Sequence, residues 1–469
     1  MTKTKLDELR NILNSRNYSK IIQFAESLNH DEILYSTILE AFERILATNV
    51  NCKSIIRFCR LRKSSIERLQ DAILGKGMGK SYYLFALSVE GADIERLQDA
   101  ICKTDDENSI YDFALNIKGA NIEKLQDAIC NLHASEWTYK FALNVKGINI
   151  RKLEKEMCEY GGGTHIIQFA LNIKGANIKR LQQAIIDSNN SEHMYEFAKS
   201  IPGADIKLLE DMVCKTKRMN TIIDFARTVN GCNVKKLESV VCNHGKAIDI
   251  YHFALDVPGA NIEKLQKAIE KFNDFEMIYK FAYNIELANL KSLETLIIKS
   301  GRAYDIYRLA IEIPGVSIDR LCSAICKTSD ALQIYSFALN VKGANIVELQ
   351  SAICKTSDCK LIYEFASHIK NINIENLQEA IFREIDIFDI SNLDFSFVYA
   401  KYVYFFAHNI KGANLKKFSR MILKTRSQEF ISDFKKNLMC TEDELINEVS
   451  ENEIGFVIDN FKIKELMEL

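Results

Sequence analysis

Proline is nearly absent from this chain, with 3 residues among 469, and tryptophan occurs once. Because proline breaks the interior of a helix, its scarcity is compatible with a chain that is helical throughout. Apolar residues make up 47% of the sequence, which excludes a disordered tail or linker. The closest approach to a long apolar run, Phe395 to Ala407, is interrupted by Lys401. A bilayer-spanning helix needs about 20 residues, so we expect no membrane span.

Net charge is also low, at −2. The composition therefore lacks the basic field that attracts nucleic acids. The charge is unevenly distributed, because residues 441–469 contain nine acidic and two basic residues, which leaves 59 basic and 54 acidic residues in the first 440. The first residues, MTKTKLDELR, are polar and lack the apolar core of a signal peptide.

A period of 28 residues runs through most of the chain. The dipeptide Phe-Ala marks it at Phe85, Phe113, Phe141, Phe169, Phe197, Phe225, Phe253, Phe281, Phe337 and Phe365, with Leu309-Ala310 at the same place in one unit. A period kept through ten intervals without an insertion indicates a stack of small units, each burying its apolar face against its neighbours. Such an array offers a long surface rather than one obvious pocket.

Each unit predicts two short helices, which we number from the Phe. Position 7 is Gly in ten of twelve units, which is typical of a helix C-terminus capped by a residue with a left-handed backbone conformation. Position 9 is Asn, Asp or Ser in all twelve units, which is typical of a helix N-cap. At position 7, Asn371 is an acceptable substitute and Leu287 is not. Apolar residues at positions 10, 13, 16 and 17 form one stripe of helix B, and those at positions 26, 1, 2 and 5 form one stripe of helix A.

These patterns predict an all-α fold, a right-handed α-solenoid (superhelix) of about twelve 28-residue helix-turn-helix repeats with helical caps. Residues 1–57 form an N-terminal helical cap with degenerate repeats, residues 58–424 form the array, and residues 425–469 form an acidic C-terminal helical cap. The interval from Phe365 to Phe406 is 13 residues longer than a period, which predicts an insertion near 384–401 as a loop or an added helix.

Thirteen cysteines are present, and seven share one position of the repeat: Cys102, Cys130, Cys158, Cys214, Cys242, Cys326 and Cys354. Stacked helices lie about 8–10 Å apart, whereas a disulfide needs a Cα separation of about 4.4–6.8 Å. We therefore expect reduced thiols and a cytoplasmic protein.

No motif for catalysis, nucleotide binding or metal binding is complete. The segment GKGMGKS at 75–81 has Leu74 where a phosphate-binding loop needs its first Gly. Cys322 with Cys326, and Cys130 with His133, each place two ligands on one helix face, whereas structural zinc takes four. We assign no catalytic residue, no cofactor and no metal, and expect that the chain is not an enzyme.

Any position repeated every 28 residues becomes a row along the array, and three rows are candidates for function. The first is Tyr at position 27: Tyr83, Tyr111, Tyr139, Tyr195, Tyr251, Tyr279, Tyr307, Tyr335, Tyr363 and Tyr404. Such rows stack the bases of single-stranded nucleic acid or, more often, pack between helices with the hydroxyl at the rim. Because Ile167 and Ile223 replace Tyr in two units, we favour packing.

The second row is the outer face of helix A, where positions 28 and 4 are i, i+4 neighbours. Position 28 varies and position 4 is small and polar, an arrangement by which a modular protein reads one ligand unit per repeat. The alternative is an ordinary solvated face. The candidate partner-binding residues of this row are Lys140, Asn144, Gln168, Asn172, Asp224, Thr228, His252, Asp256, Lys280, Asn284, Arg308 and Glu312.

The third row is basic and lies on helix B. Position 12 contributes Arg96, Lys124, Lys152, Arg180, Lys236, Lys264, Arg320 and Lys417, and position 19 contributes Lys103, Lys215, Lys271, Lys299, Lys327, Lys355, Arg383 and Lys424. A stripe of this kind is suited to a phosphate backbone. However, acidic residues at positions 11 and 15, such as Glu123 and Asp127, favour the i, i+4 ion pairs of a solvated helix.

The unit resembles the two-helix repeats of the tetratricopeptide, pentatricopeptide and HEAT-type α-solenoids. That resemblance implies a superhelical scaffold that binds peptides, proteins or RNA. Over residues 58–424 the pattern FAxxxxGANIxxLQxAI is also similar to uncharacterised repeat arrays of phages and bacteria. From the residues and the resemblance together we expect a non-enzymatic scaffold that captures a protein partner on the solenoid surface. The alternative is a modular single-stranded RNA- or DNA-binding protein that uses the Lys/Arg stripe and the Tyr row.

Overall fold

The computed structural model describes residues 3–15, 17–28, 35–48, 51–61, 66–76, 78–387, 393–425 and 427–438. Within these ranges all regular structure is helical: thirty α-helices and one short 3-10 helix, η2 (Glu270–Phe272), without a strand. The predicted all-α repeat fold is thereby confirmed. The chain divides into two compact units, Met1–Leu237 and Glu238–Leu469, which are described separately.

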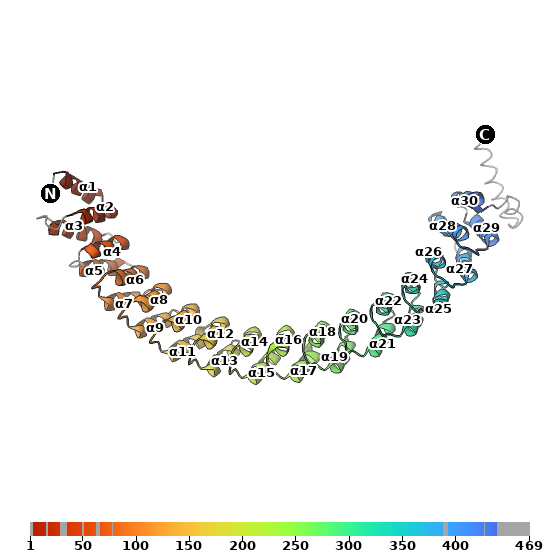
Figure 1. Ribbon diagram of the computed structural model, residues 1–469, viewed down its shortest axis with the longest axis horizontal. Coiled ribbons are helices and arrows are strands. Elements are labelled where there is room, and N and C mark those ends of the chain that lie inside the picture. Colours follow the sequence, from red (N-terminus) through yellow and green to blue (C-terminus); the bar gives the residue numbers. More distant parts are fainter. Residues whose placement is uncertain are drawn as a thin grey trace. The chain divides into compact units, whose positions relative to one another are not determined.

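In the first unit, successive helices alternate between two layers, so that even-numbered helices neighbour one another and odd-numbered helices do the same (Figure 1). The helices A of this unit are α2 (Tyr18–Ser27), α4 (Cys52–Leu61), α6 (Gly79–Ser88), α8 (Glu107–Asn116), α10 (Ser135–Asn144), α12 (Gly163–Asn172), α14 (Ser191–Ser200) and α16 (Met219–Thr228). The remaining helices of this unit are α1 (Lys3–Ser15), α3 (Tyr35–Thr48), α5 (Ile66–Lys76), α7 (Ile94–Ile101), α9 (Ile122–Asn131), α11 (Ile150–Tyr160), α13 (Ile178–Asp187) and α15 (Ile206–Thr216). Helix α17 (Val234–His244) begins in the first unit and ends in the second. The degenerate N-terminal repeats thus follow the same two-layer order.

The second unit continues the alternation. Its helices A are α18 (Ala247–Asp256), α20 (Phe275–Asn284), α22 (Ala303–Glu312), α24 (Ala331–Asn340), α26 (Cys359–His368), α28 (Leu393–Asn409) and α30 (Gln428–Leu438). Its helices B are α19 (Ile262–Ile269), α21 (Leu290–Ser300), α23 (Ile318–Ile325), α25 (Ile346–Ile353), α27 (Ile374–Ile387) and α29 (Leu415–Lys424).

The core is a column of side chains that each repeat supplies from the predicted stripes. In one repeat, Ile110 and Phe113 of helix A and Leu125 and Ile129 of helix B are fully buried. A helix of eight to ten residues is marginal alone in water, so burial of this column against the neighbouring repeats provides the stability of the array.

The turn between helices A and B has the predicted chemistry. The backbone φ is positive at all ten position-7 glycines, for example 83° at Gly119, and at Asn371. These values lie in the left-handed region, which glycine adopts without penalty and asparagine tolerates. Leu287 does not adopt a positive φ and is 82% exposed. The turn therefore closes in that repeat without the left-handed residue.

Helix B begins at position 9, as predicted. The Asn121 side chain accepts a hydrogen bond of 3.2 Å from the backbone N–H of Lys124, and the position-9 Asn or Asp caps helix B in the same way in ten other repeats. Ser317 makes no such bond. The cap satisfies a backbone N–H that the helix leaves without a partner.

Part of the 13 extra residues after Phe365 lengthens two helices. α27 has 14 residues and α28 has 17, whereas neighbouring helices have eight to eleven. Residues 388–392 of the predicted insertion lie outside the described residues. Beyond residue 424 the period continues, because α30 buries Phe434, which stands 28 residues after Phe406. The rest of the predicted acidic cap, 439–469, also lies outside the described residues.

Candidate functional site

A tyrosine hydroxyl connects helix A of each repeat to helix A of the next. Nδ2 of Asn144 donates to the hydroxyl of Tyr111 at 2.9 Å and to the carbonyl of Lys140 at 3.0 Å. This tyrosine contact, from position 27 to a position-4 side chain in the next repeat, recurs in the pairs Tyr83–Asn116, Tyr139–Asn172, Tyr195–Thr228, Tyr251–Asn284, Tyr279–Glu312, Tyr307–Asn340, Tyr335–His368, Tyr363–Asn409 and Tyr404–Asn437. Packing with the hydroxyl at the rim, as favoured from the sequence, describes all ten tyrosines.

The residue type at position 4 also changes where the tyrosine of position 27 is absent. Ile167 and Ile223 replace Tyr in two repeats, and the residues that stand 33 positions later are Ser200 and Asp256 rather than Asn. Seven of the ten tyrosines have an Asn partner, six of them at an interval of 33 residues and the seventh, Asn409, across the longer α27 and α28. Position 4 therefore helps to hold helix A of one repeat against helix A of the next.

The position-28 side chains mostly contact residues of their own helix. Lys140 lies over the ring of Trp137, 4.2 Å from its centroid, and pairs with Glu136 at 2.6 Å. Lys280 pairs with Glu276 in the same i, i+4 arrangement. Arg308 lies 3.7 Å from the Tyr279 ring centroid. These side chains remain partly exposed, and their predicted role in partner binding stays a prediction.

The other predicted residues of this face are similarly placed. Asp224 pairs with Arg227, and its carbonyl accepts a hydrogen bond from the Thr228 hydroxyl. His252 lies 3.8 Å from Asp256. The structure thus brings positions 28 and 4 together within each helix A, while most position-4 groups are also engaged by the tyrosine contact.

Position 3 of helix A carries exposed apolar side chains that the sequence analysis did not single out. In the first unit they belong to four successive repeats, and we call Leu87, Leu115, Leu143 and Leu171 the leucine row. Each of these leucines is between 45% and 54% exposed. The signal was present in the sequence, because Leu follows the buried Phe-Ala at a position that the helical stripe assigns to the solvent side.

The leucine row ends at Lys199 and Arg227, which occupy position 3 in the next two repeats. In the second unit, position 3 again carries four apolar residues in succession: Leu255, Tyr283, Ile311 and Leu339, each 45–57% exposed. Each unit therefore presents its own block of one exposed apolar side chain per repeat.

Helices B are connected by a buried amide at position 14. Nε2 of Gln98 donates to the carbonyl of Asn121 at 3.0 Å, and the Asn121 N–H donates back to Oε1 of Gln98 at 2.7 Å. Gln98 is 2% exposed. The same two hydrogen bonds, to the residue 23 positions later, are made by Gln70, Gln126, Gln182, Gln266 and Gln350.

Four repeats carry a glutamate at position 14, and each of these carboxylates pairs with a base in the next repeat. One oxygen of Glu210 accepts from the Asn233 N–H at 2.6 Å, and the other lies 3.1 Å from Nζ of Lys236. Glu210 is 2% exposed. The same arrangement joins Glu154 to Arg180, Glu238 to Lys264 and Glu294 to Arg320. A buried carboxylate needs such a partner because its desolvation is otherwise uncompensated.

The remaining bases of position 12 pair with an acid at position 15 of the preceding repeat. Lys124 lies 3.0 Å from Asp99, and the other pairs are Arg96–Asp71, Lys152–Asp127 and Lys417–Glu379. All eight predicted bases of position 12 therefore face an acid across the repeat junction. The expectation of ion pairs within one helix was wrong for them, because helices B stack closely enough for the neighbouring repeat to supply the acid.

The four repeats without a base at position 12 obey the same rule. They carry Leu208, Ser292, Glu348 and Asn376 there, and the preceding repeats have no acid at positions 14 and 15. Position 12 is thus basic only where an acid precedes it. Its charges neutralise acids of the array, which weakens the case for position 12 as a phosphate-binding stripe.

Position 19 is different, and in the second unit it forms what we call the basic row: Lys271, Lys299, Lys327, Lys355 and Arg383. All five side chains are exposed, and none makes an ion pair within the described part of the chain. In the first unit the same position is mixed, with Glu159 and Asp187 between Lys103 and Lys215. At the end of a helix, a cation is also stabilised by the helix dipole.

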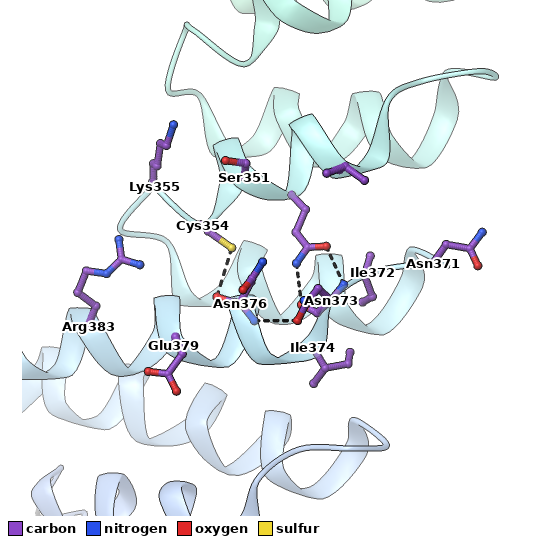
Figure 2. A pocket seen from close by; sticks show the side chains of 12 residues that line it. Ser351, Cys354, Lys355, Asn371, Ile372, Asn373, Ile374, Asn376, Glu379 and Arg383 are labelled. Atoms are coloured by element: carbon purple, nitrogen blue, oxygen red, sulfur yellow. Dashed lines mark hydrogen bonds between the residues drawn. The ribbon is translucent and has the colours of Figure 1, made fainter.

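An open groove of 1030 Å³ lies between α25 and α27, beside this row (Figure 2). Ser351 and Asn376 occupy the places of the acid and the base there, so no ion pair crosses the groove at that point. Figure 2 shows Lys355 and Arg383 at the same end of the groove, with Asn371 at the opposite end. A smaller groove of 620 Å³ between α21 and α23 is lined by Lys327.

The twelve described cysteines are free thiols. Burial raises the pKa of Cys102 and Cys214 to about 11, so both thiols are protonated at neutral pH. No cluster of three or more His, Cys, Asp or Glu side chains within the described ranges is placed to hold a metal ion. Among the described helices, none combines the length and apolarity needed to cross a membrane.

Comparison of the sequence with protein-family models gave no match, and comparison with curated proteins gave none either.

Proposed function

We propose that this chain is a non-enzymatic scaffold that captures a protein partner along its helices A. The leucine row carries the proposal. Single exposed leucines are ordinary on protein surfaces, but contiguous exposed apolar side chains mark interaction sites. Here one leucine, about half exposed, recurs at the same place in four successive repeats. In a solenoid, these positions form one continuous line.

The surroundings of the leucine row suit a protein interface. Leu143 lies one turn after Tyr139 and Lys140 on α10, so an aromatic ring, an apolar side chain and a variable polar side chain share one face. Tyr139 and Lys140 are both partly exposed. Tyrosine and tryptophan are enriched in interfaces, and Trp137 lies on the same helix. Variation at position 28 then provides specificity from repeat to repeat.

The test is site-specific photo-cross-linking with the full chain. A photoreactive amino acid replaces Gln168, which precedes Leu171 by one turn of α12. This variant is added to an extract of the source cells, and the mixture is illuminated. We expect covalent capture of a discrete protein, and loss of that adduct in Leu115→Asn/Leu143→Asn with an unchanged thermal unfolding temperature. The control is Leu208→Asn, which removes a leucine that is 40% exposed on helix B. An adduct that persists in the double variant contradicts the proposal.

The basic row favours a second candidate function, the binding of single-stranded RNA or DNA. Five exposed cations, one per repeat, beside open grooves are suited to a phosphate backbone. Filter binding of an oligonucleotide across a range of salt concentrations tests it. Five phosphate contacts give a slope of log K against log salt of about −3.5, and Lys327→Gln/Lys355→Gln reduces it. A slope near zero contradicts this candidate.

A further inference from the structure

We infer that the leucine row receives a linear acidic segment of the protein partner, held in the polyproline II conformation with an apolar residue at every third position. This inference rests on the proposed function and specifies the chemistry of the partner. Three observations carry it: the repeat spacing of the leucines, the cations that accompany them, and the tyrosines beside them.

The spacing selects the conformation of the ligand. Helices α6, α8, α10 and α12 stack side by side in one layer (Figure 1), and packed helices lie about 8–10 Å apart. A polyproline II helix has three residues per turn and rises about 3.1 Å per residue, so every third side chain returns to one face after about 9.3 Å. The ligand therefore meets one leucine per turn.

Other regular conformations fit the row less well. A β-strand presents a side chain to one face every second residue, about 6.6–6.8 Å apart, which is out of step with the repeats. An α-helix rises about 1.5 Å per residue and is about 10–12 Å wide. An α-helix lying along the row would therefore place only every sixth or seventh residue opposite a leucine. The row is one leucine wide, because the polar Asn116, Asn144 and Asn172 adjoin it at position 4.

The charge beside the row selects an acidic ligand. Position 6 carries Lys118, Lys146 and Lys174 three residues after Leu115, Leu143 and Leu171, whereas Glu90 follows Leu87 in the first repeat of the row. All three lysines are exposed and make no ion pair within the described residues. The apolar block of the second unit has Pro258, Glu286, Pro314 and Lys342 at this position, and so carries one cation where the leucine row carries three.

The tyrosines beside the leucines suit the same ligand. Tyr111 and Tyr139 precede Leu115 and Leu143 by one turn, and the tyrosine contact fixes both hydroxyls. Grooves lined by aromatic rings are the usual receptors for polyproline II segments, whose extended conformation is set before binding. The partner's apolar side chain then lies against a Leu and a Tyr in three of the four repeats, and against Leu171 and Ile167 in the fourth.

Fluorescence anisotropy with synthetic peptides and the full chain tests the inference. The probe is four consecutive Leu-Asp-Pro triplets. The comparison peptides are a scrambled peptide of the same composition, one with Lys in place of Asp, and a helical peptide with Leu at every seventh position. We expect the triplet peptide to bind most tightly, and Leu115→Asn/Leu143→Asn to weaken it about tenfold. Leu208→Asn serves as the control that leaves binding unchanged. Lys118→Gln/Lys146→Gln/Lys174→Gln is expected to weaken binding and reduce its salt dependence.

The outcomes separate this inference from the proposed function. Equal or tighter binding of the scrambled, basic or helical peptide overturns the inference, as does failure of the triplet peptide to bind. In either case the cross-linking result still decides whether a protein is captured along helices A. Oligo(dT) that competes for the leucine row overturns the inference in favour of a nucleic acid.

Discussion

Helices A and helices B join neighbouring repeats by different chemistry. Between helices A the tyrosine contact is formed by uncharged groups in most repeats, such as Tyr111 and Asn144. Between helices B a buried side chain at position 14 must match the base or the backbone of the next repeat, as Glu210 matches Lys236. Helix B is therefore constrained by its neighbour's charge. Helix A is free to change at positions 28 and 3, which is where a partner is expected to bind.

The largest effect is expected where a carboxylate is placed at position 14 and no base follows in the next repeat. Gln182→Glu buries a charge opposite Leu208, and we expect a loss of about 3 kcal/mol in the free energy of unfolding, measured by urea titration. Gln126→Glu is the matched change at a junction where Lys152 follows, and we expect a much smaller loss. Adding Leu208→Lys should restore the stability of Gln182→Glu. Equal losses in the two glutamate variants would show that position 12 does not compensate position 14.

The converse change removes the base and keeps the buried acid. Lys236→Met leaves Glu210 with the Asn233 N–H alone, and we expect a loss of about 2 kcal/mol, because Lys236 is partly exposed and solvent screens the pair. The second change Glu210→Gln restores a neutral amide like that of Gln126 and should recover most of the loss. Urea midpoints of the wild type, the two single variants Lys236→Met and Glu210→Gln, and the double variant check this. No recovery in the double variant would contradict it.

On the helix A side the expected effect is smaller. Tyr139→Phe removes only the hydroxyl that accepts from Asn172, and this contact is exposed. We expect a loss of about 1 kcal/mol or less in the free energy of unfolding. Tyr111→Phe provides a second measurement at an equivalent contact. A loss as large as that of Gln182→Glu would show that contacts between helices A stabilise the repeat junction as strongly as contacts between helices B.

The last expected effect is absent at neutral pH and concerns the cysteines of helix B. Burial raises the pKa of Cys102, Cys158 and Cys214 from 9.0 to about 11 in the folded chain. Below pH 9 the thiols are protonated whether the chain is folded or unfolded. Between pH 9 and 11 they ionise mainly in the unfolded chain, so stability decreases as pH rises. The triple variant Cys102→Ala/Cys158→Ala/Cys214→Ala should show a shallower decrease of the urea midpoint over this range. Parallel curves for the variant and the wild type would contradict the assignment.

Residues whose role lies within one repeat could be predicted from the sequence. Gly119 needs only a left-handed backbone and Asn121 only the start of its own helix, so both were recognisable from local chemistry. Tyr111 was correctly expected to pack between helices. Its partner Asn144 could not be named, because that requires the lateral alignment of one repeat on the next.

The contacts of helix B show the same limit. Lys124 was expected to pair along its own helix, whereas Asp99 of the preceding repeat lies 3.0 Å away. Gln98 stands beside the buried Leu97, and this placement of an amide among apolar neighbours was the available signal for a buried hydrogen-bonding role. The leucine row was missed for a different reason. An exposed leucine is unremarkable in one repeat and becomes informative only when its exposure is known in four.

The matching of position 12 to the preceding acid limits how such an array grows. A repeat copied by recombination is inserted next to a new neighbour, and it stacks without penalty only if both new junctions have compatible charges. The segment AICKTSD occurs at 324–330 and again at 352–358. Both copies belong to repeats without an acid at positions 14 and 15, where Cys322-Ser323 and Gln350-Ser351 stand. A repeat of this kind demands no base from whatever follows it. Charge-free junctions are therefore the points at which this gene can gain or lose a unit while the protein keeps its fold.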